Sequence, residues 1–432
     1  MIGGVKMKIP LIKVQQKKEI FYISKMRVKD LKEYIVLNFR YPYIDSLNEM
    51  DKLKFKTYLK QLEQLNVEYR YGDNNIQRAI NLDKMKKLSK YIKEDNNFLP
   101  NALILGCFKR DSDFIEDYSS LITIENESLD LFSMNLDSTF ELTAIDGQHR
   151  LAGLIMSESE IIDELEVPIV LLFGVSLTVS SKIFLDINSN QKSVDKSLMY
   201  DLLPVLNDGN DNGKLKQKEI NSLKKCHSIC VTFYKSKSSP FYKQIRMLGT
   251  GSGAISQAFF VDQIYPHIHK GILENLSEQD QFEILYSYFR MIRKTFQNDW
   301  PVLAINPTDS EHTQLVLNVK KSQLPKTLGV GAWLKILPEI MQYIGFSKVR
   351  MEQDFRETNN NLEFKKHLLK NIENSLLNLF KQLEGKIVWN EVDYKETISK
   401  NSKGESLPTF LTGTNKVAIN NLAATLIKIL LI

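Results

Sequence analysis

The sequence contains little cysteine, only three among 432 residues, and this excludes a fold held together by a framework of disulfides. So few cysteines fit a reducing cytoplasm, where we expect the protein. Cys226 and Cys230 flank His227, but no second Cys/His pair follows at the spacing of a zinc finger. Because a structural zinc site needs four ligands, the sequence predicts no metal.

Segments that would target or anchor the chain to a membrane are also lacking. The first eight residues do not contain the apolar stretch of a signal peptide. The apolar segment 422–432 is too short to cross a bilayer and is interrupted by Lys428. We therefore expect no membrane association, and we predict that 422–432 forms a last helix packed on the body of the protein.

A strong charge of either sign is absent as well. The net charge is only +5, which permits binding to nucleic acid without requiring it. The content of 43% hydrophobic and 25% charged residues is that of an ordinary globular protein. The length is sufficient for two domains.

The pattern of the first half mixes strands with helices. Strands are predicted at 9–14, 20–23, 102–108, 120–125, 139–145 and 167–175. Helices are predicted at two places within 30–68, separated at Pro42, and at 84–94, at 150–163 and from 176–178 onward. This half of the chain is therefore expected to be an α+β domain with a mixed sheet.

A polar segment then divides the chain. Residues 207–213 consist only of Asn, Asp and Gly, the strongest linker signal in the sequence. Beyond it the pattern is mostly helical, at 215–225, 255–269, 278–296, 327–345, 361–384 and 415–431. We predict one domain at 1–205 and a helical domain at 206–432.

One short stretch combines a strand, a tight turn and a helix. The alternating segment 140–145 runs into residues 146–150, Asp-Gly-Gln-His-Arg, where a helix begins. Gly147 can adopt a positive φ and lets a ligand approach the backbone. A helix N-terminus presents unpaired N–H groups and the positive end of its dipole, so a phosphate is a natural occupant. An ordinary Asx-capped turn explains the same residues.

Two further blocks accompany this pentapeptide. Gln77 and Arg78 precede a capped helix, with 98–101 before a strand, and the segment 184–198 follows a buried strand. Together with 146–150, these blocks resemble the DGQHR-domain family, whose best-known members are the DndB proteins of DNA phosphorothioate (sulfur) modification systems.

This resemblance implies both a fold and a partner. The family's core is similar to the ParB/sulfiredoxin superfamily, whose strand–turn–helix junction holds the phosphates of a nucleotide or nucleic acid. The resemblance thus implies DNA as a partner and a role beside the DNA-modification enzymes of the same system. Binding of ATP with Mg²⁺ and formation of a homo-oligomer stay open.

The side chains of the pentapeptide supply the groups for such a site. Arg150 matches phosphate oxygens in a bidentate fork. His149 can donate to a phosphate or transfer protons near neutral pH, and Gln148 suits a base edge or a sugar hydroxyl. The phosphate or nucleotide site is therefore predicted to contain Gly147, Gln148, His149 and Arg150, and the resemblance implies that Gln77 and Arg78 belong to it as well. Asp146 and His149 are the candidates for catalysis.

Each of these side chains also has a purely structural interpretation. Arg150 can form a salt bridge with Asp146, and His149 can be a buried histidine that holds the turn. Asp146 can orient its neighbours, help hold a divalent cation or cap the turn. These alternatives stay open at the level of sequence.

Polar residues at the end of the next helix offer a second wall for the pocket. They are Asp186, Asn188, Asn190, Gln191 and Lys192. Lys192 is a candidate phosphate partner. Amide side chains at a helix end also satisfy free backbone groups, which is the alternative.

A basic segment follows the linker. Between 208 and 248 nine Lys and Arg residues face three acidic ones, a net charge of +6, and Tyr234 and Tyr242 lie among them. Such a pattern is typical of a DNA-backbone contact, although solvated lysines in a connector look the same. The predicted backbone contacts are Lys214, Lys216, Lys224, Lys225, Lys235 and Lys237.

Two functions from different classes follow. The first is a DNA-binding regulator or accessory protein of a DNA-modification system, with a phosphate-binding pocket at 146–150. The second is an ATP-hydrolysing or DNA-nicking enzyme that uses the same pocket. We favour the first because the sequence supplies no recognisable nucleophile; a scaffold that recruits modification enzymes is a third option.

Overall fold

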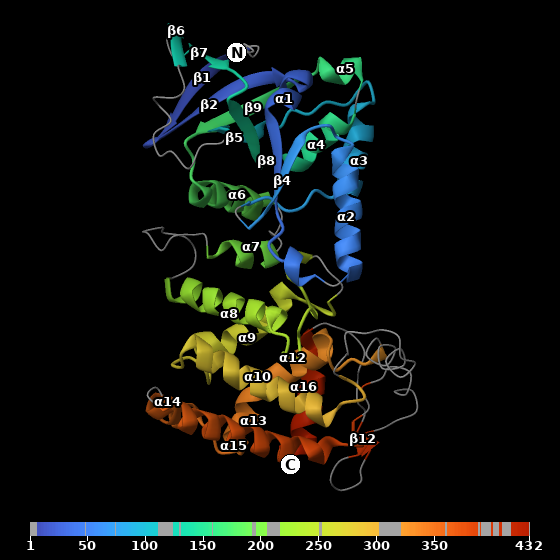
Figure 1. The fold of residues 1–432 in the computed structure, drawn as a ribbon, viewed down its shortest axis with the longest axis vertical. Helices are drawn as coiled ribbons and strands as arrows, with labels where there is room; N and C mark the ends of the chain where they lie inside the picture. Colours follow the sequence, from blue (N-terminus) through green and yellow to red (C-terminus); the bar gives the residue numbers. More distant parts are fainter. Residues whose placement is uncertain are drawn as a thin grey trace. The chain divides into compact units, whose positions relative to one another are not determined.

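The computed structural model describes residues 7–47, 49–73, 75–110, 124–128, 131–157, 159–191, 196–204, 217–249, 253–301, 321–358, 361–387, 389, 399–400, 406–407 and 416–431. The chain divides into two compact units, Met1–Gly209 and Asn210–Ile432. The predicted α+β class is confirmed: the first unit is built on a mixed sheet and the second is mostly helical (Figure 1). The predicted linker 207–213 lies outside the described residues.

The sheet of the amino-terminal unit has nine strands in the order β4-β3-β8-β5-β9-β2-β1-β7-β6. In chain order they are β1 Met7–Gln16, β2 Glu19–Arg27, β3 Ile35–Arg40, β4 Glu68–Gly72, β5 Leu103–Lys109, β6 Ile124–Ser128, β7 Leu131–Leu136, β8 Phe140–Asp146 and β9 Glu166–Phe173. The pairs β3/β4, β3/β8 and β5/β9 are parallel, and the others are antiparallel.

The helices of this unit are α1 Val28–Tyr34, α2 Glu49–Glu63, α3 Leu82–Ile92, α4 Gln148–Met156, α5 Glu160–Asp163, α6 Leu177–Gln191 and α7 Lys196–Leu202. Its core joins Leu105 of β5 and Leu142 of β8 with Met85 of α3 and Leu151 of α4. The helices α3 and α4 lie side by side (Figure 1).

Two expectations for this unit were wrong. Residues 35–40, predicted to be helical, form β3, because pairing with β4 and β8 outweighs the helical spacing of Leu31, Tyr34 and Ile35. The predicted helix 150–163 is two helices. Its break follows Ser157, and the hydroxyl of Ser159 caps the second helix by accepting from the Ile162 N–H.

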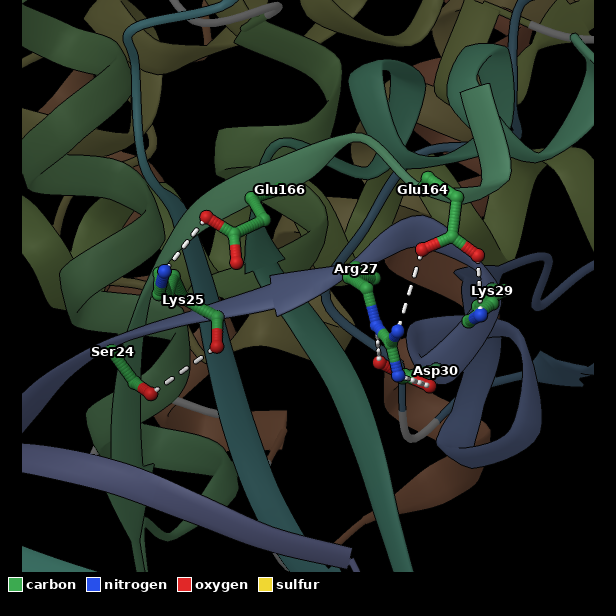
Figure 2. Close-up of polar contacts among 7 residues, drawn as sticks. All are labelled: Ser24, Lys25, Arg27, Lys29, Asp30, Glu164 and Glu166. Atoms are coloured by element: carbon green, nitrogen blue, oxygen red, sulfur yellow. Dashed lines mark hydrogen bonds and ion pairs between the residues drawn. The ribbon is translucent and has the colours of Figure 1, made fainter. Parts of the chain in front are cut away.

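Charged side chains hold the corner where β2 meets α1 against the start of β9 (Figure 2). The Arg27 guanidinium lies 2.7 Å from Asp30 and 3.3 Å from Glu164, which Lys29 also contacts. Arg27 and Glu164 are exposed to solvent, which screens these pairs, so the pairs contribute little to stability. They set the geometry of the corner more than its stability.

The helices of the carboxy-terminal unit are α8 Gln217–Lys235, α9 Gln257–His269, α10 Glu278–Thr295, α12 Thr327–Lys335, α13 Leu337–Tyr343, α14 Lys348–Thr358, α15 Leu362–Phe380 and α16 Lys416–Leu431. Short strand pairs accompany them. Strand β10 Ile245–Arg246 pairs with β11 Ile255–Ser256, and β12 Ser399–Lys400 pairs with β13 Ser406–Leu407. The predicted helix 327–345 breaks at Ile336, since Pro338 favours the start of a new helix. The sequence reasoning missed α14.

The core of the helical unit is rich in aromatic rings. Phe241 packs edge-on against Phe289 and Trp300, at ring-centroid distances of 4.8 and 5.0 Å. Tyr288 donates a hydrogen bond to the Trp333 carbonyl at 2.8 Å, so its buried hydroxyl is satisfied. Among the helices that the structure describes, none is long and apolar enough to cross a lipid bilayer.

Candidate functional site

The pentapeptide 146–150 lies where β8 ends and α4 begins, as its sequence predicts. Gly147 is the N-cap of α4 and has φ +92°, in the left-handed region. A Cβ here would lie 2.7 Å from Leu103 Cδ2 and 2.9 Å from Arg150 Nη2, so both the conformation and the space require glycine. Since glycine has no side chain, the N-cap leaves the first N–H groups of α4 uncapped.

The Arg150 side chain folds back over this turn. Its Nη2 lies 2.8 Å from Asp146 Oδ2, and its Nη1 donates to the carbonyls of Asn101 and Ala102 at 2.8 and 3.2 Å. The guanidinium therefore joins both ends of the turn to the segment that leads into β5. Arg150 thus forms the salt bridge with Asp146 that the sequence offered as the purely structural role of this arginine.

The His149 imidazole is half-buried and bonded to the backbone. Its Nε2 accepts a hydrogen bond from the Asn81 N–H at 2.9 Å. The pKa of His149 is lowered from 6.5 to about 4, mainly by burial and also by the positive charges of Lys84 and Arg78, while the nearby Asp146 acts in the opposite direction. The ring is thus neutral near pH 7, with Nε2 as acceptor and its proton on Nδ1.

The two glutamines of the predicted site, Gln77 and Gln148, have different environments. Gln77 is buried and its side-chain amide donates to the Ile145 carbonyl in β8. Gln148 is only 2% exposed, and neither its Oε1 nor its Nε2 has a hydrogen-bond partner among the residues that the structure describes. A buried amide without partners costs about 1–3 kcal/mol, so this side chain is a group that a ligand or an ordered water can satisfy.

The beginnings of two helices meet at this place. The Asn81 side chain caps α3 by accepting from the Lys84 N–H at 2.9 Å, while its backbone N–H bonds His149 in α4. Arg78 and Lys84 are exposed, and both are near enough to His149 to affect its pKa. Two positive helix ends and two cations therefore surround His149, whereas the carboxylate of Asp146 is paired with Arg150.

Lys84 was missed by the sequence reasoning, which named only Arg78 from this side of the site. The available signal was its place in the first turn of the capped helix after Gln77 and Arg78.

The predicted second wall is only partly described. Asp186 is exposed on α6, and Asn188, Asn190 and Gln191 belong to the last turn of the same helix. Helix α6 contacts β8, the strand that leads into the turn. Lys192 lies outside the described residues.

The predicted DNA-backbone lysines belong to the carboxy-terminal unit. Lys224 and Lys225 are half-buried on α8, Lys235 ends this helix, and Lys237 is exposed in the loop that follows. Lys214 and Lys216 lie outside the described residues. The described lysines thus occupy the surface of one helix and one loop.

A pocket of about 220 Å³ lies between α2, α3 and α4. None of the predicted site residues lines it; its walls are formed by Gln61, Gln64, Leu65, Leu82, Met85, Lys86 and Met156. Within the described ranges no group of three or more His, Cys, Asp or Glu side chains is placed to hold a metal ion. Cys226 and Cys230 are buried in α8.

These observations define an α+β protein in which a strand–glycine–helix turn is braced by its own arginine and surrounded by positive charge. The model of the DndB family, described as DNA-sulfur modification-associated, matches residues 9–222. Over that region the chain matches the DndB family, and this match links it to DNA sulfur modification. No curated protein and no solved structure matches the chain.

Proposed function

We propose that this protein is a DNA-binding regulator or accessory protein of a DNA sulfur modification system, and that a phosphate group binds where α3 and α4 begin. The observation that carries the proposal is the convergence of two helix N-termini with Arg78 and Lys84 around His149. Uncapped N–H groups and positive charge favour an anion at such a place. The family match makes a DNA or nucleotide phosphate the anion of choice.

The residues of the turn divide into two roles. Arg78 and Lys84 provide charge, and the Nδ1–H of His149 and the first N–H groups of α4 provide hydrogen bonds. Arg150 and Asp146 hold the turn in shape, and Gln77 holds β8 against the segment before α3. The unpartnered amide of Gln148 suits a sugar hydroxyl or a base edge of the same ligand.

An enzymatic function for this turn has less support. A general base for phosphoryl transfer must be free to take a proton, yet Asp146 is paired with Arg150 and the Nε2 of His149 already accepts the Asn81 N–H. We therefore infer that the turn binds phosphate without cleaving it, and that catalysis belongs to other proteins of the modification system.

The test is binding of the full-length protein to labelled duplex DNA from its own promoter over a series of salt concentrations. Affinity should fall steeply with salt, because phosphate contacts release counterions. Arg78→Gln and Lys84→Gln should each weaken binding and reduce the slope of log K against log[salt] by about 1. Lys90→Gln, on the last turn of α3, removes the same charge away from the turn and should leave both unchanged.

Two outcomes would contradict the proposal. The first is a wild-type protein that forms no salt-sensitive complex with DNA. The second is a complex that Arg78→Gln and Lys84→Gln affect no more than Lys90→Gln does. ATP turnover that is lost in His149→Ala would instead favour the enzymatic alternative.

A further inference from the structure

One face of α10, in the carboxy-terminal unit, carries an aromatic ring and two arginines in a row. Tyr286, Arg290 and Arg293 are spaced at i, i+4 and i+7, so they lie on the same side of the helix. All three are half-buried. The Arg290 guanidinium lies 5.5 Å from the centre of the Tyr286 ring, in reach of a cation–π contact.

Arg293 lacks the partner that a half-buried guanidinium normally has. No hydrogen bond or ion pair joins it to any described residue, and its charged neighbour is Arg290, which repels it. Arg290 differs, because Glu373 of α15 binds its Nη2 and is itself held by the Ser287 hydroxyl at 2.8 Å. Within the described ranges the five donors of Arg293 therefore meet no acceptor, and desolvation without a counter-ion is costly unless an anion is supplied.

The loop between α8 and β10 lies along the same face. The Tyr286 hydroxyl donates to the Ser238 carbonyl at 3.3 Å, and the Phe241 ring packs on Phe289, one helical turn further on. This loop contains Lys237 and Lys243, and the Lys243 ammonium lies 5.3 Å from the centre of the Tyr242 ring. A loop that carries two lysines and a second tyrosine thus contacts α10 at Tyr286 and Phe289.

We propose that this surface, the α10 phosphate seat, binds the sugar–phosphate backbone of DNA. It consists of Tyr286, Arg290 and Arg293 of α10 with Lys237 and Lys243 of the adjoining loop. Arg293 is its centre, since its guanidinium has no partner in the described part of the chain and matches a phosphate in a bidentate contact. This inference rests on the proposed DNA-binding function and adds a second contact, on the other unit of the chain.

The experiment compares full-length wild type with Arg293→Gln, Arg293→Lys and Lys294→Gln in binding to labelled duplexes of promoter and unrelated sequence. Arg293→Gln should weaken binding to both duplexes equally and reduce the salt slope by about 1, because a phosphate contact carries no sequence information. Arg293→Lys should keep most of the slope, since it keeps the charge. Lys294→Gln removes an exposed charge from the neighbouring helix face and should bind as wild type does.

The outcomes separate this inference from the function on which it rests. A wild-type protein that binds no DNA overturns both. A wild-type complex that Arg293→Gln leaves unchanged in affinity and salt slope overturns the α10 phosphate seat alone, and so does an equal loss in Lys294→Gln. Circular dichroism of Arg293→Gln identical to wild type assigns any lost affinity to the contact instead of to misfolding.

Discussion

The two units of the chain treat their arginines differently. In the amino-terminal unit, Arg40, Arg70 and Arg150 are each held by a carboxylate, from Asp201, Glu141 and Asp146 respectively. Arg40 and Arg150 also donate to backbone carbonyls. In the carboxy-terminal unit, Arg290 has Glu373, whereas Arg293 has no hydrogen-bond or ion-pair partner among the described residues.

This difference separates arginines that stabilise the fold from Arg293, which we propose binds a phosphate. A guanidinium whose donors are all used within the protein cannot bind an anion without breaking those bonds. It follows that the arginine inside a family motif is not automatically the residue that grips the phosphate. Arg150 braces the turn, while Arg78 and Lys84 remain at its surface.

The largest expected effect comes from breaking the Arg40 network, which joins β3 to α7. Asp201 is fully buried, binds Arg40 and accepts from the Tyr43 hydroxyl at 2.5 Å. Asp201→Ala leaves the Arg40 charge buried without a counter-ion, which should destabilise the amino-terminal unit by about 3–5 kcal/mol.

This prediction is measured by hydrogen–deuterium exchange of the β3 and α7 peptides in increasing urea, because exchange follows each unit separately. Asp354→Ala, which removes a partly exposed partner of Arg350 on α14, is the control and should cost less than about 1 kcal/mol. Equal effects of the two substitutions would show that the Arg40 network is not a main support of the unit.

A smaller effect is expected at the turn. Arg150→Ala removes the ion pair to Asp146 and two bonds to backbone carbonyls, and should destabilise the amino-terminal unit by about 2–3 kcal/mol. Exchange of the β8 and α4 peptides should rise first. If Arg150→Ala weakens DNA binding but leaves exchange unchanged, Arg150 contacts the ligand directly and does not act as a brace of the turn.

Much of the fold was predictable because local patterns coincide with the tertiary structure. The β-branched run at β9 is a buried strand, and Asn81 caps α3 as its residue type suggests. The exception was β3. Its residues continue the helical spacing of α1, and they are buried on both faces, so the two-residue alternation of a strand is missing. Only its pairing with β4 and β8 makes it a strand.

At the candidate site the sequence identified the turn and offered the Arg150–Asp146 pair as one alternative, but not the other partners of these side chains. The other groups that bind His149 and Arg150 are backbone atoms of Asn81, Asn101 and Ala102, 48 to 68 residues away, and any residue type can supply them. Nor could the sequence select Lys84, since α3 carries several exposed lysines and only the fold brings this one beside His149.

The stability of each unit should depend on pH through one buried histidine. Burial is the main cause that lowers the pKa of His149 and of His267 to about 4. The unfolded chain binds a proton to each near pH 6.5, and the folded chain does so only near pH 4. The stabilising contribution is therefore complete above pH 6.5 and is lost as the pH falls toward 4, by about 2–3 kcal/mol for each unit.

This loss should appear in exchange of α4 for the first unit and in tryptophan fluorescence for the second. All three tryptophans, Trp300, Trp333 and Trp389, belong to the carboxy-terminal unit. His149→Asn should flatten the pH profile of the amino-terminal unit only, and replacement of the exposed His367 by Asn should change neither profile. A wild-type protein equally stable at pH 7 and pH 4.5 would contradict the environment described for both histidines.

The smallest effect on stability is expected at Arg293. Arg293→Gln breaks no hydrogen bond or ion pair with a described residue and relieves the repulsion from Arg290, so it should change the stability of the carboxy-terminal unit by no more than about 0.5 kcal/mol, in either direction. Urea unfolding followed by tryptophan fluorescence measures this change. Glu373→Gln, which weakens the support of Arg290, should cost more. A loss above 2 kcal/mol in Arg293→Gln would mean that Arg293 supports the fold as Arg40 does, and would contradict its assignment to a phosphate.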